Sequence, residues 1–262
     1  LISEPHQPGC TEHLYILEGE IEVTCSGEVK SARAGEALRY RGALEAHEAK
    51  TGEPLQGNWR HKTHLLFTWA AELVRHPHIL DAVEDLIGPD ILCWTTNFFI
   101  KEAAHPGFVS WHQDSTYWGL EPHDVVTAWV ALTPSDLKSG CMMVIPGTHT
   151  VDQLPHLDTF HKDNLLSRGQ EIAVEVDERR ALPCLLEPGE MSLHHIKLVH
   201  GSAPNRSQDR RIGFAIRYIP THVRQVKVRD SATLVRGSDR HGHFDHEPRP
   251  RADLDEAALA AH

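Results

Sequence analysis

Hydrophobic and polar residues alternate near the beginning of the chain and then change to a helical period. Residues 12–24 (EHLYILEGEIEVT) alternate around a Glu-Gly turn, and with SGE at 26–28 they predict a short antiparallel β meander. From residue 35 to residue 50, apolar side chains recur at the spacing of one helix face, which predicts a helix. That face comprises Leu38, Ala43, Leu44 and Ala46.

Two further helices are predicted between residues 63 and 88 (THLLFTWAAELVRHPHILDAVEDLIG). Pro77 interrupts the helical pattern, because proline lacks a backbone N–H and clashes with the preceding turn. Gly88 and Pro89 end the second helix.

From residue 91 the pattern changes to short runs rich in Val, Ile and aromatic residues, separated by Gly or Pro turns. Eight such runs after a helical lead-in predict a mainly β fold with flanking helices, a double-stranded β-helix of the jelly-roll or cupin-like barrel type. The tail from about residue 236 is polar and ends in a short helical pattern. The predicted strands are ILCWTTNFFI (91–100), FVSWHQD (108–114), DVVTAWVAL (124–132), CMMVI (141–145), IAVEV (172–176), ALPCLL (181–186), EMSLHH (190–195) and RIGFAIRYI (211–219).

Composition narrows the classes of partner. The 262 residues are 40% hydrophobic and 24% charged, and 26 basic against 37 acidic residues give a formal net charge of −11. This balance argues against a nucleic-acid or anionic-membrane partner, and no apolar run approaches the roughly 18–20 residues of a membrane span. The five cysteines are odd in number and never form CxxC, so we expect reduced thiols and a cytoplasmic protein. The sequence does not indicate an oligomeric state.

Four His-x-Asp pairs occur in the chain, and one has the scaffold of a metal site. Residues i and i+2 of a strand point to the same side, so such a pair presents an imidazole and a carboxylate together. His112 and Asp114 end an apolar strand. The 156–163 stretch, which contains two of the other pairs, has no strand pattern, and the last pair lies in the polar tail. The other pairs are His156/Asp158, His161/Asp163 and His243/Asp245.

Residues 194–220 offer the groups that would complete a non-haem iron site. Such a site needs a third ligand, usually a second histidine, and leaves positions open for co-substrate and oxygen. His200 follows an apolar segment, and Arg211 opens the next strand, where a guanidinium could hold a carboxylate through two hydrogen bonds. Taken singly, His194, His195 and His200 are better explained as loop residues, and Arg210 and Arg211 as a solvated pair. Their order along the chain, together with the strand pattern, favours a site.

Several ordered motifs show a resemblance to a known family. They are WHQD (111–114), TAWVALT (127–133), SGCMMVIPGTH (139–149), EPGEMSLHH (187–195) and HGSAPNRSQDRR (200–211). Over roughly residues 37–260 the chain resembles the phytanoyl-CoA dioxygenase family of iron(II)/2-oxoglutarate-dependent oxygenases.

The resemblance implies roles for individual residues. The implied iron(II) ligands are His112, Asp114 and His200. Arg211 would form the salt bridge to the distal carboxylate of 2-oxoglutarate, and Ser202 would make a second contact. Trp118 matches an aromatic residue of the substrate pocket in ectoine-type members, and Trp129 is a weaker pocket residue that is equally explained as core.

The resemblance also implies a reaction. Halogenating relatives replace the carboxylate ligand with a small residue, so the retained Asp114 favours hydroxylation of a small organic metabolite, with O2 consumed and 2-oxoglutarate converted to succinate and CO2. The family's substrates are diverse, and the sequence favours a small polar metabolite only weakly.

Residues 1–36 do not follow this family pattern. They resemble part of a cupin barrel, in which His6, Glu12, His13 and Glu18 would be the remaining metal-binding groups. We therefore expect a partial cupin-like extension before a dioxygenase-like domain at 37–262. The alternative function is a non-catalytic cupin-like metal-binding, ligand-binding or regulatory protein. A third hypothesis, a histidine-rich metal-binding protein, depends on HGHFDH (241–246), which has no strand scaffold.

Overall fold

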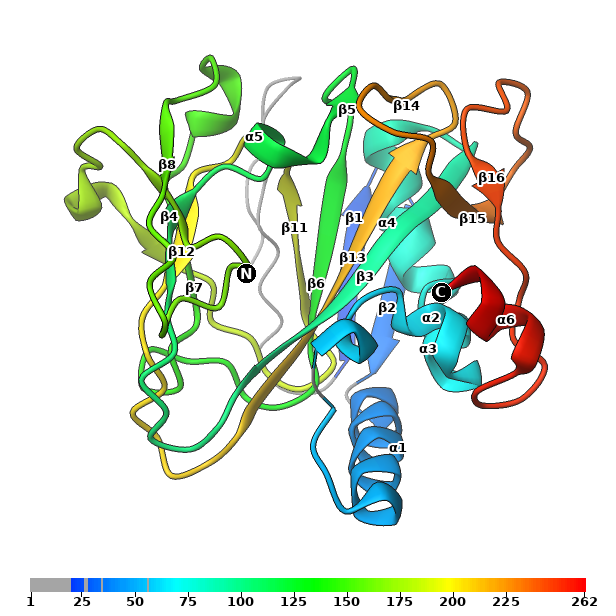
Figure 1. Cartoon of the computed structure of the whole chain (residues 1–262), viewed down its shortest axis with the longest axis horizontal. Helices are drawn as coiled ribbons and strands as arrows, with labels where there is room; N and C mark the ends of the chain where they lie inside the picture. The colour runs from blue at the N-terminus through cyan, green and yellow to red at the C-terminus, as the bar shows by residue number, and fades with distance from the viewer. Residues whose placement is uncertain (1–19, 26–27, 34, 56) are drawn as a thin grey trace.

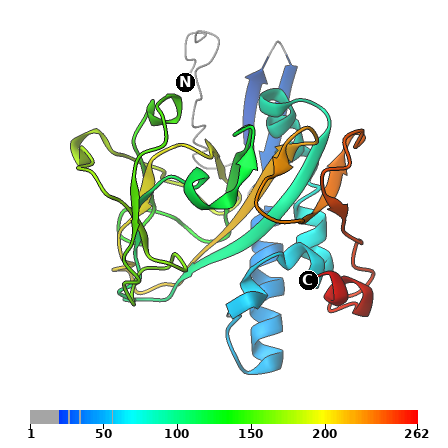
Figure 2. The same cartoon turned by 45° about the horizontal axis from the view of Figure 1, so that its top comes forward.

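Two β-sheets face each other, and helices cover the outer side of the larger one (Figures 1 and 2). The computed structural model describes residues 20–25, 28–33, 35–55 and 57–262. This is the double-stranded β-helix expected from the strand pattern, and both sheets contribute side chains to the space between them.

The major sheet has the strand order β11-β6-β13-β3-β15-β16 and is antiparallel except for the β15–β16 pair. Its central strand β13 pairs with β3 on one side and with β6 on the other. The bounds are β3 Ile91–Lys101, β6 Val126–Ala131, β11 Met191–His195, β13 Arg211–Pro220, β15 Ser231–Arg236 and β16 Asp245–His246.

The minor sheet has the antiparallel order β10-β7-β12-β4. Short paired strands accompany both sheets: β14 with β5, β8 with β9, and the N-terminal hairpin β1–β2. The bounds are β1 Glu20–Cys25, β2 Glu28–Arg33, β4 Val109–His112, β5 Leu120–Glu121, β7 Met142–Val144, β8 His156–Asp158, β9 Gln170–Ile172, β10 Leu182–Pro183, β12 His200–Ser202 and β14 Arg224–Gln225.

The alternation of strand side chains divides the core in two. On β13, Ile212, Phe214 and Ile216 pack outward against the helices in the largest apolar cluster, whereas the odd-numbered residues face the minor sheet. The helices are α1 Gly35–Thr51, α2 Thr63–Leu66, α3 Thr68–Leu73, α4 Pro77–Ile87, α5 Ser115–Trp118 and α6 Glu256–Ala261, with 3-10 turns at Gly57–Arg60, Thr148–Thr150 and Glu178–Arg180.

The helical predictions are largely confirmed, with two corrections. Helix α4 starts at Pro77 and ends before Gly88, as expected. The preceding helix is split into α2 and α3, because Phe67 adopts an extended conformation between them. On α1, Leu44 is buried but the predicted core residue Ala46 is exposed, since the helix turns Tyr40 toward the core instead.

Corrections also apply to the strands. The run IAVEV (172–176) forms a strand only up to Ile172, and Val174 is exposed because no neighbouring strand pairs with it. The run 181–186 keeps only a two-residue strand. Conversely, His156–Asp158 is a strand, β8, where no strand pattern was recognised, and the polar tail packs onto the sheet through β16 and the buried Phe244.

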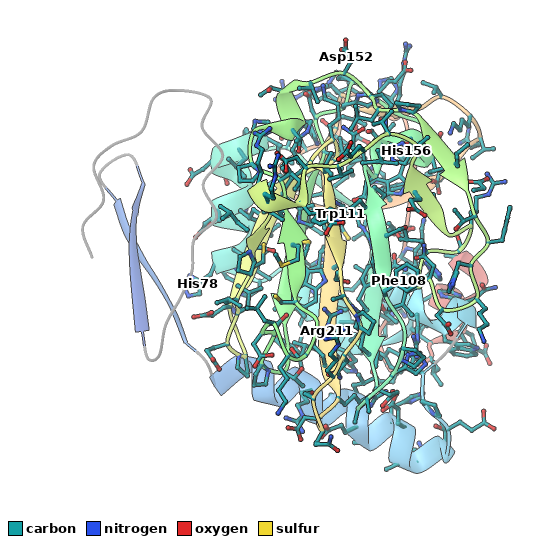
Figure 3. The ribbon with its side chains drawn as sticks, turned by 90° about the vertical axis from the view of Figure 1, so that its left-hand side faces the viewer. His78, Phe108, Trp111, Asp152, His156 and Arg211 are labelled. Atoms are coloured by element: carbon teal, nitrogen blue, oxygen red, sulfur yellow. The ribbon has the colours of Figure 1, made fainter. Side chains whose placement is uncertain are left out.

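The N-terminal predictions are only partly visible. The hairpin β1–β2 is present, and β2 lies against α4 at the side of the molecule (Figure 3). His6, Glu12, His13 and Glu18 lie outside the described residues, so the cupin-like interpretation and the boundary at residue 37 stay predictions. Within the described part of the chain, every helix is too short or too polar to cross a membrane.

Candidate metal centre

Three potential ligands meet between the two sheets. The ligand atoms of His112, Asp114 and His200 all lie within 4.8 Å of one another, and all three residues are buried. His112 ends β4 and His200 begins β12, and the two residues are direct cross-strand partners. Asp114 follows as the residue before helix α5, with its Oδ1 3.4 Å from His112 Nε2.

Both histidines are held in the same tautomer. His112 Nδ1 donates to the Ser110 carbonyl oxygen and His200 Nδ1 donates to the Leu198 carbonyl oxygen, each at 2.9 Å. A carbonyl oxygen can only accept, so the proton of each neutral ring sits on Nδ1 and the Nε2 lone pair is left for a ligand bond. Two imidazole nitrogens and one carboxylate in this arrangement fit a divalent transition metal with open positions.

Gln113, between the two ligands, points to the other side of the strand and fixes it in place. Its side chain is fully buried; Oε1 accepts from Gln153 Nε2 and the Leu154 N–H, and Nε2 donates to the Lys197 carbonyl oxygen. The Gln113 N–H donates to His156 Nε2 at 2.9 Å. His156, in a stretch without a predicted strand pattern, is therefore not one of the three converging ligands but supports the segment that carries His112 and Asp114.

The pKa shifts at this centre favour an ionised Asp114 carboxylate beside a neutral His200 imidazole. Burial alone would raise the pKa of Asp114, but the contact with His112 and the surrounding positive charge, including that of Arg217, hold it well below its usual range. Burial and the proximity of His112 lower the pKa of His200 to about 4. Unprotonated nitrogen and oxygen atoms are what a metal requires of its ligands.

Two buried basic side chains lie together at the start of β13. Arg211 and Lys101 are cross-strand partners, 2% and 0% exposed. Arg211 Nη1 donates to the Gly140 carbonyl oxygen at 2.5 Å, and Lys101 Nζ donates to Ser202 Oγ at 2.7 Å. Arg211 Nε has no hydrogen-bond partner, and among the described residues neither side chain forms an ion pair. Figure 3 shows Arg211 from the minor-sheet side.

The two tryptophans singled out in the sequence contact different arginines. Trp129 stacks over Arg211 with 5.2 Å from Cζ to the ring centroid, and it needs Gly213 as its neighbour, because a Cβ there would lie 1.9 Å from the ring. Trp118 contacts Arg217 at 5.3 Å. Trp129 therefore lines the Arg211 end of the sheet face, and Trp118 lies near the other end of β13.

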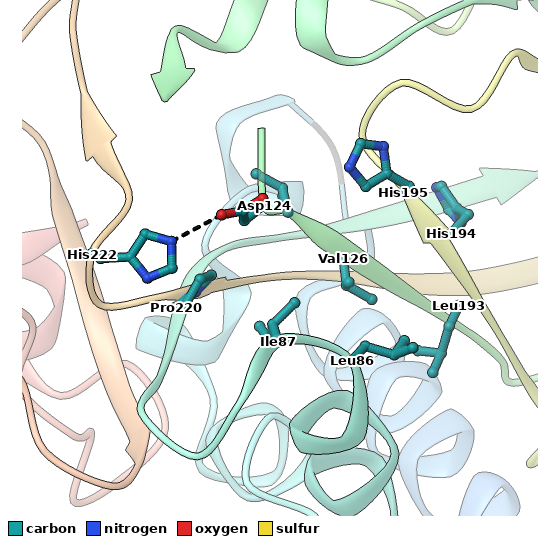
Figure 4. Close-up of a pocket in the computed structure, with 10 residues that line it drawn as sticks. Leu86, Ile87, Asp124, Val126, Leu193, His194, His195, Pro220 and His222 are labelled. Carbon is teal, nitrogen blue, oxygen red and sulfur yellow. Dashed lines mark hydrogen bonds and ion pairs between the residues drawn. The ribbon is translucent and has the colours of Figure 1, made fainter. Parts of the chain in front are cut away.

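A separate pocket of about 400 Å³ opens at the end of α4 (Figure 4). Apolar residues of α4 and β11 form one wall, and the Asp124–His222 pair, 2.9 Å apart, forms another. His195 lines it with a pKa lowered to about 4 by burial and by the charges of His149 and Lys197. In the described residues, the one group of three potential metal ligands that lie together is His112, Asp114 and His200, so neither this pocket nor 241–246 provides a second one.

Comparison with known proteins decides the family. The family model of phytanoyl-CoA dioxygenases matches residues 29–213, well over half of the chain. The chain belongs to the phytanoyl-CoA dioxygenase family. The match includes all three residues of the candidate metal centre and Arg211.

Relatives in this family are moderately similar in sequence. Human peroxisomal phytanoyl-CoA dioxygenase is 27% identical over 172 residues, which are 62% of this chain and 50% of that protein. A probable alpha-ketoglutarate-dependent hypophosphite dioxygenase of Stutzerimonas stutzeri is 31% identical over 162 residues, 58% of this chain and 54% of that protein. The chain thus spans about half the length of the curated relatives it matches.

Solved structures are similar over most of the chain. The apo form of the non-heme monooxygenase ThoJ is 38% identical with a TM-score of 0.76, covering 88% of this chain and 86% of ThoJ. CytC3 with Fe(II) and alpha-ketoglutarate is 23% identical with a TM-score of 0.62, covering 90% of each chain. At that identity CytC3 supports the fold alone, which agrees with the two facing sheets described above.

Proposed function

We propose that this protein is an iron(II)/2-oxoglutarate-dependent dioxygenase that hydroxylates a small organic metabolite. The observation that carries the proposal is a pair of complementary sites on facing sheets. One offers two imidazole nitrogens and a carboxylate, and the other offers two buried basic side chains without a carboxylate partner among the described residues. The first suits a divalent metal, and the second suits an anionic co-substrate.

The residues present fit both groups. His112, Asp114 and His200 would hold iron(II), because their nitrogens and oxygen are unprotonated and converge. Arg211 would pair with the distal carboxylate of 2-oxoglutarate, with Ser202 as a second contact held by Lys101. When bound, iron and 2-oxoglutarate would supply the oxidising chemistry that inserts an oxygen atom of O2 into a substrate C–H bond, with succinate and CO2 as co-products.

The chain's own contribution is orientation and the exclusion of water. The carbonyl oxygens of Ser110 and Leu198 fix the two imidazole rings, and Trp129 holds the Arg211 guanidinium on its face. Burial of these groups strengthens their interaction with an anionic co-substrate, because few water molecules compete for the donors.

Anaerobic titration of the purified protein with iron(II) and 2-oxoglutarate tests the proposal. A visible metal-to-ligand charge-transfer band is expected in the wild type and is expected to weaken in Asp114→Ala and in Arg211→Ala. Succinate release in the presence of O2 then provides the assay for a substrate screen. A folded protein that binds iron but shows no band would instead support the alternative, a non-catalytic cupin-like binding or regulatory protein.

We also propose a reducing, cytoplasmic location. Cys93, Cys141 and Cys184 are buried, and burial raises the pKa of Cys141 to about 11. Protonated, inaccessible thiols do not form disulfides readily, which suits a compartment where thiols stay reduced. Mass spectrometry after alkylation of the native and the unfolded protein would test this, with alkylation of all three cysteines expected only after unfolding.

A further inference from the structure

The inward face of the major sheet carries polar side chains that the proposed iron and 2-oxoglutarate sites do not use. Residues directly opposite each other in an antiparallel pair lie on the same face. Arg217 of β13 lies opposite Thr127 of β6, and Thr127 lies opposite His194 of β11. The His194 ring lies 5.0 Å from the His200 ring, so this row of side chains runs toward the candidate metal centre.

Arg217 is a buried guanidinium with unused hydrogen-bonding capacity. It is 6% exposed, and its Nη1 donates to Asn97 Oδ1 at 2.6 Å. Its Nε has no hydrogen-bond partner, and within the described part of the chain it forms no ion pair at hydrogen-bonding distance. Burying an N–H of a charged group without a hydrogen-bond partner costs free energy of folding. Packing alone therefore does not explain an arginine at this position.

The surroundings of Arg217 hold its guanidinium in one plane. Its Cζ lies 5.6 Å from the Phe99 ring centroid and 5.3 Å from that of Trp118. Trp118 is the last residue of helix α5, and this helix begins directly after the candidate metal ligand Asp114. The contact with Trp118 therefore places the Arg217 guanidinium against a helix that starts at the candidate metal centre. Aromatic contacts leave the edge of the guanidinium free, and this edge carries its hydrogen-bond donors.

Thr127 adds a second donor next to Arg217. Its side chain is 1% exposed and its Oγ1 has no hydrogen-bond partner. A hydroxyl and a guanidinium N–H on adjacent strands of one face form a donor pair for an oxygen atom with negative charge. The negative charge of Asp114 favours the charged form of Arg217 through space, and no hydrogen bond joins these two side chains in the described residues.

We propose that Arg217 and Thr127 bind an anionic oxygen group of the substrate, a carboxylate or a phosphorus oxyanion, beside the aromatic side chains of Trp118 and Phe99. The inference rests on the proposed function, since it assumes that the protein is an enzyme with a substrate. It narrows the class of that substrate to small organic anions. It also separates two arginines of β13: Arg211 binds the co-substrate, and Arg217, six residues later, selects the substrate.

Paired probes that differ in charge but hardly in size test the proposal. We would measure the dissociation constants of 3-phenylpropanoate, 3-phenylpropanamide and 2-phenylethylphosphonate by isothermal titration calorimetry. One series uses protein loaded with iron(II) and 2-oxoglutarate under anaerobic conditions. A second series uses the metal-free Arg211→Met variant, in which the other anion site is removed.

The wild type is expected to bind the carboxylate at least about 10-fold more tightly than the amide, which corresponds to hydrogen bonds to a charged group. Arg217→Gln should lose this preference, with the affinity for the amide unchanged. Thr127→Val should weaken carboxylate binding by roughly 3- to 10-fold. Arg206→Gln, at an exposed arginine, makes the same change in net charge and should leave all affinities unchanged. The phosphonate shows which of the two oxyanions the site prefers.

Equal binding of carboxylate and amide by the wild type would overturn the proposal, and so would a preference that survives in folded Arg217→Gln. If Arg217→Gln does not fold, Arg217→Lys keeps the charge, and it should retain part of the preference. The proposed oxygenase activity and the proposed anion site can be rejected independently of each other. A missing charge-transfer band with the carboxylate preference intact rejects the oxygenase and not the anion site, and a normal band without the preference rejects only the anion site.

Discussion

Two regions of the molecule bury ionisable side chains, and they differ in whether those side chains have partners of opposite charge. Where the C-terminal tail packs on β15, the Glu247 carboxylate lies 2.6 Å from Lys62 Nζ and 3.0 Å from His64 Nε2, and it accepts from the hydroxyls of Ser231 and Thr233. At the start of β13, Lys101 and Arg211 lie side by side, and within the described residues no carboxylate pairs with either.

Burial does not distinguish these regions, because Glu247 is 9% exposed and Arg211 is 2% exposed. The difference is whether each charge has a partner of opposite sign. A carboxylate with its own buried partners holds segments of the chain together, whereas the buried Arg211 guanidinium without a counter-charge lowers the stability of the free protein unless a ligand supplies the missing negative charge. The comparison makes opposite predictions for affinity and stability in the two regions.

The largest expected effect is on co-substrate binding. Arg211→Met should lower the affinity for 2-oxoglutarate by roughly 100-fold or more, since two charge-assisted hydrogen bonds are lost. The free energy of unfolding should stay unchanged or rise, because an unmatched buried cation is removed. Titration of the charge-transfer band and urea denaturation measure the two quantities.

Arg210 next to it provides a matched control. Arg210 pairs with Glu48 at 2.5 Å and with Glu102 at 2.9 Å. Arg210→Met should lower stability by about 1 kcal/mol and leave the affinity for 2-oxoglutarate nearly unchanged. A loss of affinity in both variants would show that overall positive charge, and not a specific site, attracts the co-substrate.

The second prediction concerns the cluster around Glu247. Glu247→Gln should lower the free energy of unfolding by about 3–5 kcal/mol, because Lys62 loses a buried counter-charge and the hydrogen bond of His64 is weakened. The affinity for 2-oxoglutarate should not change. Urea denaturation at neutral pH measures this, and a variant as stable as the wild type would contradict the structural role given to Glu247.

Local sequence patterns anticipated the candidate metal centre. The strand that ends at His112 was predicted, but Asp114 lies beyond it as the residue before helix α5, so the two-residue spacing found the right pair on a shorter strand than expected. The order of His200 and Arg211 along the chain made them candidates, and the family resemblance gave them roles. Strand β12, which carries His200, was not predicted, because three residues are too few for an alternating pattern.

The residues missed in the sequence depend on long-range pairing. Lys101 becomes informative only as the cross-strand partner of Arg211, and Thr127 only as that of Arg217. No local pattern encodes the register between strands about 90–110 residues apart. His156 was set aside because its stretch is polar, yet its hydrogen bond to the Gln113 N–H belongs to the support of the site.

A third prediction concerns how the stability contributed by the cluster around Glu247 depends on pH. Burial would raise the pKa of Glu247, but His64 and Lys62 lower it to about 2, and burial lowers the pKa of His64. In both groups the unfolded chain therefore binds more protons than the folded one, so stability falls as the pH falls. The loss should begin below about pH 6.5 through His64 and increase below about pH 4.5 through Glu247. Stability of Glu247→Gln should depend less steeply on pH than that of the wild type, and parallel curves would contradict this.

The smallest expected effect is the uptake of a proton by Lys101 when 2-oxoglutarate binds. Burial and the charge of Arg211 lower the pKa of Lys101 to about 6, so near pH 7.5 most of the free protein carries a neutral amine there. A bound dicarboxylate would raise that pKa, and binding should take up a fraction of a proton. Calorimetric titration of 2-oxoglutarate in two buffers with different ionisation enthalpies measures the uptake. Lys101→Met should abolish it and weaken binding by about 10-fold or less, whereas equal heats in both buffers for the wild type would mean that Lys101 keeps one protonation state and serves only to hold Ser202.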